Sequence, residues 1–193
     1  MSYRRVSHRK YFEEYAYVLD YLPYGYPYPV AGRGSVKRGP VAQAVGEMYF
    51  MLLELEPYRG IPLNVGEKVF VGKGMSGKIR KVVRRIRYDE LTAAAKDELE
   101  SVIEKIVVMR EREFVEFFNK SEPITTRMHS LELLRGIGKK TLWKILEERK
   151  KRPFTSFADI QGRVKIDPKR LVVERIIEEL KGGQKYYVFT ALP

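Results

Sequence analysis

The sequence predicts an α+β protein with a small β-barrel, a helical connector, a helical block and a final strand that returns to the barrel. Three observations indicate this order. Residues 15–88 hold short runs rich in aromatic and β-branched residues, separated by glycine and proline. Residues 89–183 hold apolar residues mainly at helical spacing. Residues 186–190 again have strand character, and the helical block offers them no strand to pair with.

The charge of the chain changes sign along its length. The 193 residues have a formal net charge of +12. Residues 41–88 hold nine basic and four acidic residues, and residues 123–193 hold sixteen and eight, whereas residues 89–122 hold five and ten. Two basic blocks therefore flank an acidic one. This distribution predicts a polyanionic partner, nucleic acid before a membrane surface.

Composition excludes several classes of site. The chain has no cysteine, which excludes disulfides and thiolate metal sites, and its two histidines, His8 and His129, are too few for a multi-histidine metal site. No apolar run approaches the roughly 20 residues of a membrane helix. No apolar segment follows the basic N-terminus, as it would in a signal peptide. We therefore expect a cytoplasmic protein with no membrane partner and no cofactor.

The chain is expected to begin with a basic arm at residues 1–14, followed by the barrel at residues 15–88. Residues 15–21 are aromatic and β-branched and predict the first strand. Alternating tyrosine and proline at 23–29 exclude a helix or a central strand there. The tyrosine rings of this stretch either stack on bases or cover the open end of the barrel.

Three further strands are expected in the barrel. One lies within 42–55 and bends near Gly46, another covers 65–71, and the last covers 78–88. The polar face of the last strand is strongly basic, as is the surface that an OB-like barrel turns to nucleic acid. Its six candidate binding residues are Lys78, Arg80, Lys81, Arg84, Arg85 and Arg87.

The glycine-rich stretch at 72–78 fits G-x-G-x-x-G and nearly fits the phosphate loop of nucleotide hydrolases. Both motifs require a helix directly after the loop. The segment that follows alternates like a strand, and Ile79 occupies the position where Ser or Thr would hold magnesium. We therefore interpret the stretch as a β-turn and not as a nucleotide site.

Residues 89–122 form the acidic connector. Thr92 is a favourable N-cap, and helices are expected over 93–106 and 110–119. Because negative charge repels a polyanion, we expect the connector to lie off the binding face.

The strongest candidate site is a glycine-containing turn between a short helix expected at 128–132 and a second helix directly behind the turn. Glycine adopts backbone conformations closed to other residues and leaves the turn bare of side chains. The unpaired N–H groups at the start of the second helix can hold an anion, and two lysines add positive charge there. The alternative is an ordinary turn between helices, with glycines that serve close packing. The candidate residues are Arg135, Gly136, Ile137, Gly138, Lys139, Lys140 and Thr141.

This stretch resembles the hairpin of the helix-hairpin-helix family, which grips nucleic-acid backbones without reading their sequence. Arg135 replaces the proline common at its position, which adds charge and loosens the turn. The resemblance implies that the phosphate meets the amides of Gly136, Gly138, Lys140 and Thr141. It also implies a candidate monovalent-cation site at the carbonyls of Glu132, Leu134 and Ile137.

A second, degenerate hairpin is expected at 162–166, where Arg163 and Lys165 are candidate binding residues. Asp167 is expected to cap the next helix, with Pro168 in its first turn. Together the two hairpins make a tandem unit over 123–183. The remaining segment, 184–193, contains the final strand and is expected to pack on the barrel.

The whole chain resembles an archaeal family catalogued as domain of unknown function 655. Residues 15–22, 48–56, 134–141 and 154–160 carry the resemblance best. That family is described as nucleic-acid binding, often RNA binding, with an OB-like domain beside the hairpins. The resemblance therefore specifies the fold more closely than the function.

Three functions are consistent with these features. We expect a non-catalytic protein that binds RNA or DNA without sequence preference. One alternative is a DNA glycosylase with abasic-site lyase activity, because residues 136–141 resemble a motif of such enzymes. These enzymes use the lysine that matches Lys140 as a nucleophile. Asp159 would correspond to the aspartate that they place further along the chain. The helical base pocket of those enzymes conflicts with the β character of 15–88. The other alternative is an assembly module of a ribosomal or repair complex. The choice between DNA and RNA, the number of strands, the pathway and the oligomeric state stay open.

Overall fold

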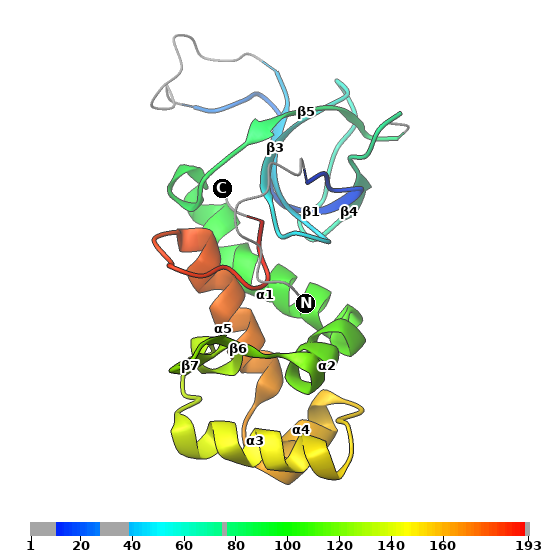
Figure 1. Cartoon of the computed structure of the whole chain (residues 1–193). Coiled ribbons are helices and arrows are strands. Elements are labelled where there is room, and N and C mark those ends of the chain that lie inside the picture. The colour runs from blue at the N-terminus through cyan, green and yellow to red at the C-terminus, as the bar shows by residue number, and fades with distance from the viewer. Residues whose placement is uncertain (1–10, 28–38, 75–76, 192–193) are drawn as a thin grey trace. The chain divides into compact units, whose positions relative to one another are not determined.

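The structure, a computed structural model, describes residues 11–27, 39–74 and 77–191. It is a mixed α+β fold of two compact units (Figure 1). One unit is formed by Ile103–Glu178, and the other, called the sheet unit below, is formed by Lys10–Val102 together with the segment from Glu179 onward. The division falls within two helices, which therefore contribute to both units.

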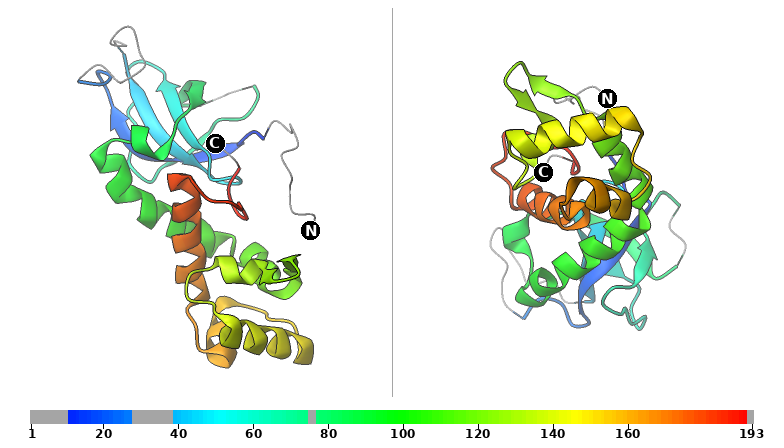
Figure 2. Two further views of the ribbon diagram at one scale, coloured as in Figure 1. Left: turned by 60° about the vertical axis from the view of Figure 1, so that its left-hand side comes forward. Right: turned by 90° about the horizontal axis from the view of Figure 1, so that it is seen from below.

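The sheet unit contains five antiparallel strands in the order β4-β1-β2-β3-β5. The sheet is curled, as Figures 1 and 2 show. The register of β1 against β2 shifts between Val18 and Asp20, and such an irregularity bends a strand. The strands are β1 Tyr15–Leu22, β2 Val41–Gly46, β3 Leu52–Pro57, β4 Lys68–Phe70 and β5 Ile79–Arg85.

The concave face of the curled sheet is filled by small and branched apolar side chains. They recur at every second position of a strand, since alternate side chains of a strand share a face. Ala16 and Val18 of β1 and Leu53 and Leu55 of β3 belong to this core, and all four are buried.

The expected strand in the 49–55 part of this run overlaps β3, but the bend near Gly46 is wrong, because β2 ends there and the chain reverses before β3. The carboxylate of Glu13 accepts hydrogen bonds from the backbone N–H groups of Met48, Tyr49 and Met51 at 2.8, 2.8 and 3.2 Å. The same carboxyl group lies where a Cβ at Gly46 would stand, so this turn requires glycine. A buried acid distant in sequence thus holds the turn.

The other two expected strands are shorter than predicted. Residues 65–67 bond to β1 outside the regular ladder, with Gly66 N donating to Val18 O at 2.7 Å, so β4 begins at Lys68. The glycine-rich stretch before β5 leads into a strand and not a helix, as expected. Its central residues, 75 and 76, lie outside the described residues, as do residues 1–10 of the expected basic arm and the end of the tyrosine–proline stretch.

The helices expected from apolar spacing are confirmed. Thr92 caps α1, its Oγ1 accepting from Ala95 N at 3.0 Å, and Asp167 caps α5 through Arg170 N at 3.1 Å. The helical elements are the 3₁₀ turns η1 Tyr88–Glu90 and η2 Ser130–Leu133 and the helices α1 Ala93–Met109, α2 Glu111–Lys120, α3 Lys139–Lys151, α4 Phe157–Val164 and α5 Pro168–Lys181.

The short helix expected at 128–132 is wrong in type. Two short strands, β6 Pro123–Thr125 and β7 Met128–His129, form a ribbon that leads into η2. His129 Nδ1 accepts a hydrogen bond from Leu131 N at 3.1 Å, and this local bond from a side chain to the backbone favours a tight turn over an α-helix.

The final strand expected at 186–190 is also wrong, because this segment has no strand geometry. Its backbone N–H groups turn instead to the buried carboxylate of Glu179, which accepts from Val188, Phe189 and Thr190 at 2.8, 3.0 and 2.9 Å. The segment still reaches the sheet unit, where Ala191 N donates to Tyr49 O at 3.1 Å.

Candidate nucleic-acid interface

The glycine hairpin between η2 and α3 presents bare backbone. Gly136 has φ +90°, which favours glycine, and Gly138 is the N-cap of α3. A Cβ built at either glycine would meet no atom within 4 Å. Ile137 is buried between them and anchors the turn, with its N–H donating to Leu134 O at 3.1 Å. The backbone of the hairpin is therefore open on the side of the two glycines.

Among the described residues, no acceptor is found for the first N–H groups of α3. The first helical bond runs from Leu142 N to Gly138 O at 2.9 Å, so the amides of Lys139, Lys140 and Thr141 precede the ladder. Gly138 has no side chain to cap them, and the turn contains no acidic residue. Three N–H groups and the positive end of the helix dipole can therefore meet an anion.

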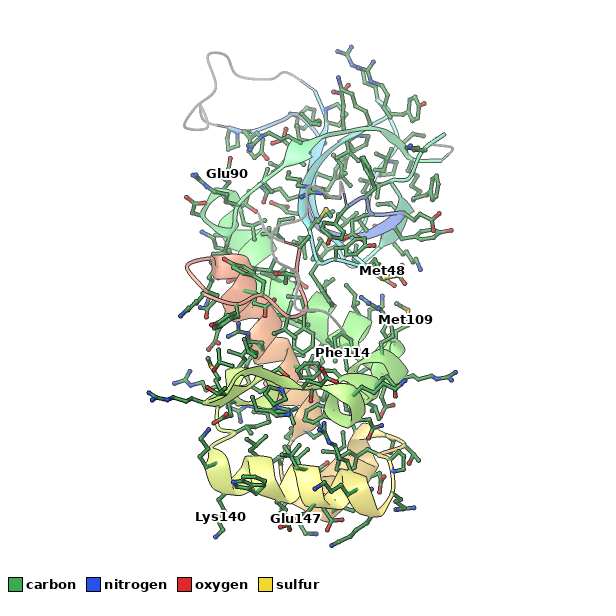
Figure 3. The ribbon with its side chains drawn as sticks, viewed as in Figure 1. Met48, Glu90, Met109, Phe114, Lys140 and Glu147 are labelled. Carbon is green, nitrogen blue, oxygen red and sulfur yellow. The ribbon has the colours of Figure 1, made fainter. Side chains whose placement is uncertain are left out.

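The basic residues of the hairpin are not equivalent. Lys139 Nζ lies 2.8 Å from Glu132 Oε1 and donates to Arg127 O at 3.0 Å. Arg135 and Lys140 are exposed, and among the described residues no carboxylate lies within ion-pair distance of either. Figure 3 shows Lys140 projecting outward from α3. The free positive charge of the hairpin therefore belongs to Arg135 and Lys140.

Glu132 fastens the entrance to the hairpin. Its Oε2 accepts from the backbone N–H of His129 at 2.7 Å, which closes a capping box around η2. This hydrogen bond and the ammonium of Lys139 lower the pKa of Glu132. The carboxylate thus stays ionised and holds Lys139 beside the turn.

His129 lies buried next to this box. Burial lowers its pKa, and the positive charge of Arg149 lowers it further. Arg149 itself does not reach outward, since its Nη1 donates to Ser121 O at 2.9 Å and to Phe118 O at 3.1 Å. Its role is to hold the end of α2.

The second predicted hairpin differs from the first. Arg163 is largely buried, bonds to Glu148 and Asp159 at 3.1 and 3.2 Å, and lies over the ring of Phe154. These contacts take Arg163 away from any phosphate, so it is a packing residue in this structure. Lys165 is exposed at the left-handed end of α4. Since Asp167 directly precedes α5 and accepts from Arg170 N, this helix start is already capped.

The basic face of β5 is largely neutralised within the sheet unit. Ion pairs join Lys78 to Glu67, Arg80 and Lys81 to Glu56, Arg84 to Glu54 and Glu90, and Arg87 to Asp89. Arg85 donates instead to Tyr11 O at 2.6 Å. Arg80, Lys81, Arg84 and Arg85 lie on β5, and Lys78 and Arg87 flank it, but most of their charges have partners that the sequence did not reveal.

Other predicted chemistry is also constrained. Asp159, the aspartate of the lyase alternative, pairs with Arg152 and accepts from Thr155 N, and these partners together with Arg163 lower its pKa. Within residues 11–27, 39–74 and 77–191, no three His, Asp or Glu side chains gather as metal ligands would. No helix in the described part of the chain has the length and apolarity to cross a membrane.

One exposed residue at the hairpin was missed in the sequence. Trp143 is 60% exposed on α3, one helical turn after Lys140. Two signals pointed to it: it is the only tryptophan of the chain, and its place in the helical repeat lies outside the apolar side formed by Leu142 and Ile145.

Fold and site together define a basic α+β protein with a curled five-stranded sheet and an uncapped glycine hairpin on a helical unit. Residues 12–191 match the family described as "Protein of unknown function (DUF655)", and the chain belongs to that family. This confirms the resemblance seen in the sequence. The uncharacterized protein MJ0038 of Methanocaldococcus jannaschii is 46% identical over 180 residues, which cover 92% of this chain and 80% of that relative. The crystal structure of Af1531 from Archaeoglobus fulgidus is similar with a TM-score of 0.83 and 50% identity, over 93% of this chain and 100% of that one.

Proposed function

We propose that the protein binds the backbone of RNA or DNA without sequence preference, through the hairpin of residues 135–141. The observation that supports this most is the coincidence of two open glycines with three amides and the cations of Arg135 and Lys140, none of which has a partner within the described part of the chain. Backbone N–H groups at a helix start and free cations suit phosphate oxygens, which are the same in every nucleotide.

We further propose that the hairpin and α3 form a helix-hairpin-helix unit in which η2 replaces the first helix. The α4–α5 pair resembles it but lacks an open helix start, so it serves as its packing partner. The curled sheet is interpreted as an OB-like barrel that closes incompletely, since β1 pairs with both β2 and β4 but no pairing joins the described residues of the edge strands β4 and β5. Its ion-paired β5 makes it the weaker of the two contact surfaces.

Two variants test the binding proposal. Replacing Lys139 and Lys140 together by Glu should weaken binding more than about tenfold for every oligonucleotide sequence, because the free cation of Lys140 and the neighbouring cation of Lys139 both become anions beside the phosphate. Lys120→Glu is the control, since Lys120 is an exposed, ion-paired lysine of the same unit. Equal effects of the control and of the double variant would contradict the assignment to the hairpin.

We propose binding without catalysis. A lyase would need an available base beside the nucleophilic amine of Lys140, whereas Asp159 is held by two arginines. Borohydride trapping on abasic DNA tests this directly. A covalent adduct that disappears in Lys140→Ala would replace our proposal with the lyase alternative.

The assembly role remains the second proposal for partners. Among the described residues, Phe12 and Tyr24 are the most exposed aromatic side chains of the sheet unit, at 62% and 90%. A ribosomal or repair protein retained after nuclease digestion would support it.

A further inference from the structure

Trp143 is an exposed aromatic side chain without a structural role. Among the described residues of 103–178 it is the one exposed aromatic, while the phenylalanines of that part are buried or half-buried. No ring or cation of the described chain lies over its indole. A tryptophan normally buries most of its large apolar surface, so the exposed indole of Trp143 is available to a ligand.

The surroundings of Trp143 are positive on one side. Lys140 precedes it by three residues and Lys144 follows it, and both are exposed without ion pairs among the described residues. Positions three apart on a helix lie about 5–6 Å apart at Cβ, so Lys140 and the indole are neighbours. Glu147 bounds the same face one turn further on, and Figure 3 shows it on the side of α3 from which Lys140 projects.

This combination fits one class of ligand. A cation pair beside a flat aromatic face suits a phosphate joined to an exposed base, because bases stack on aromatic side chains irrespective of their sequence. In a duplex, both faces of each internal base are covered by neighbouring base pairs, so no base face is free for the indole to stack on. Unpaired nucleotides offer a free face.

We propose that Trp143 stacks on an unpaired base next to the phosphate held by the hairpin, so that the site prefers single-stranded nucleic acid or unpaired loops and ends over continuous duplex. This inference rests on the proposed function. The hairpin amides and lysines supply backbone binding to both forms, and Trp143 supplies the difference between them.

The chain provides its own probe, since Trp143 is its single tryptophan. The full-length protein is titrated with a labelled single strand of about twelve nucleotides and with the duplex of the same sequence, within the site size of known single-strand binders. Label anisotropy reports binding, and tryptophan emission reports stacking. We expect quenching by the single strand alone, and a dissociation constant roughly 5- to 100-fold lower for the single strand than for the duplex.

Variants test the stacking of Trp143 separately from the proposed binding of the nucleic-acid backbone. Trp143→Ala should raise the single-strand dissociation constant to that of the duplex and leave duplex binding unchanged, whereas Trp143→Phe should retain part of the preference. Lys140→Glu should weaken both forms by a similar factor. Because Trp143 is exposed, an unchanged thermal midpoint should show that these variants stay folded.

Each result has one meaning. Loss of all oligonucleotide binding in the wild-type protein refutes the proposed function itself. Equal binding of both forms without quenching, or a Trp143→Ala variant that keeps the single-strand preference, overturns the stacking inference alone and leaves Trp143 as a protein contact.

Discussion

Lys139 and Glu132 form an ion pair across the glycine hairpin, with 2.8 Å between Nζ and Oε1. The neighbouring Lys140 has no such partner among the described residues. Two adjacent lysines therefore differ in how much positive charge they offer to a ligand, although nothing in their sequence positions says so.

This difference predicts unequal effects of single charge reversals. Lys140→Glu should weaken nucleic-acid binding several-fold more than Lys139→Glu, whose ammonium is already compensated by a carboxylate. Replacing a lysine that contacts a phosphate should also make the slope of log affinity against log salt shallower by about one. Anisotropy titrations at several salt concentrations measure both quantities. Equal losses for the two variants would contradict the ion-pair argument.

Glu132→Gln should strengthen binding about two- to fivefold at low salt, because it removes a negative charge and releases Lys139. The amide oxygen of Gln can still accept from His129 N, so the capping box is kept. The matched control is Glu116→Gln, which releases Lys120 in the same unit but far along the chain from the hairpin. Unchanged or weaker binding of Glu132→Gln would count against the hairpin as the binding site.

Stability should depend on His129 as the pH falls through the ordinary histidine pKa of 6.5. Its Nδ1 accepts from Leu131 N, so the neutral form carries its proton on the buried Nε2, and protonation of Nδ1 would break the cap. The folded pKa lies below the ordinary value of 6.5, and the unfolded state therefore takes up protons first. The free energy of unfolding should fall as the pH drops below 6.5, by at most about 1.4 kcal/mol per pH unit.

Urea unfolding at several pH values tests this. His129→Asn keeps a side-chain acceptor for the cap and should flatten the profile, with His8→Asn as the control for the other histidine. An unchanged slope in His129→Asn would show that another group is responsible.

Glu179→Gln should destabilise the sheet unit by about 2–3 kcal/mol, because an NH₂ group would replace one oxygen that accepts backbone N–H donors from 188–190. Glu178→Gln removes a neighbouring but more exposed carboxylate and should change the free energy of unfolding by less than about 0.5 kcal/mol. Denaturant unfolding compares the two. Similar small effects would mean that the C-terminal segment is not held by Glu179.

Sequence patterns predicted the parts of this fold that depend on neighbouring residues. Thr92 as the cap of α1 and the glycines at the start of α3 are examples, since each acts within one turn of the chain. The turn held by Glu13 and the segment held by Glu179 were missed, because a carboxylate that gathers backbone amides leaves no periodic signal. The tail therefore looked like a strand.

The candidate site was predicted only in part for the same reason. The order of residues 136–141 alone predicts a candidate anion site. The acidic partners of Lys139, Arg163 and the β5 residues could not be predicted, because their carboxylates approach these cations only after folding. Trp143 could have been found, since a lone tryptophan on the polar face of a helix is visible in the sequence.

The central claim is tested most directly by a salt-titrated binding panel of single- and double-stranded RNA and DNA with the wild-type protein and Lys140→Glu. We predict binding to all four that weakens steeply from about 50 to 300 mM salt, with a shallower slope and lower affinity in the variant. Affinity that stays flat across this range, or that is the same in Lys140→Glu, would contradict a phosphate-binding hairpin.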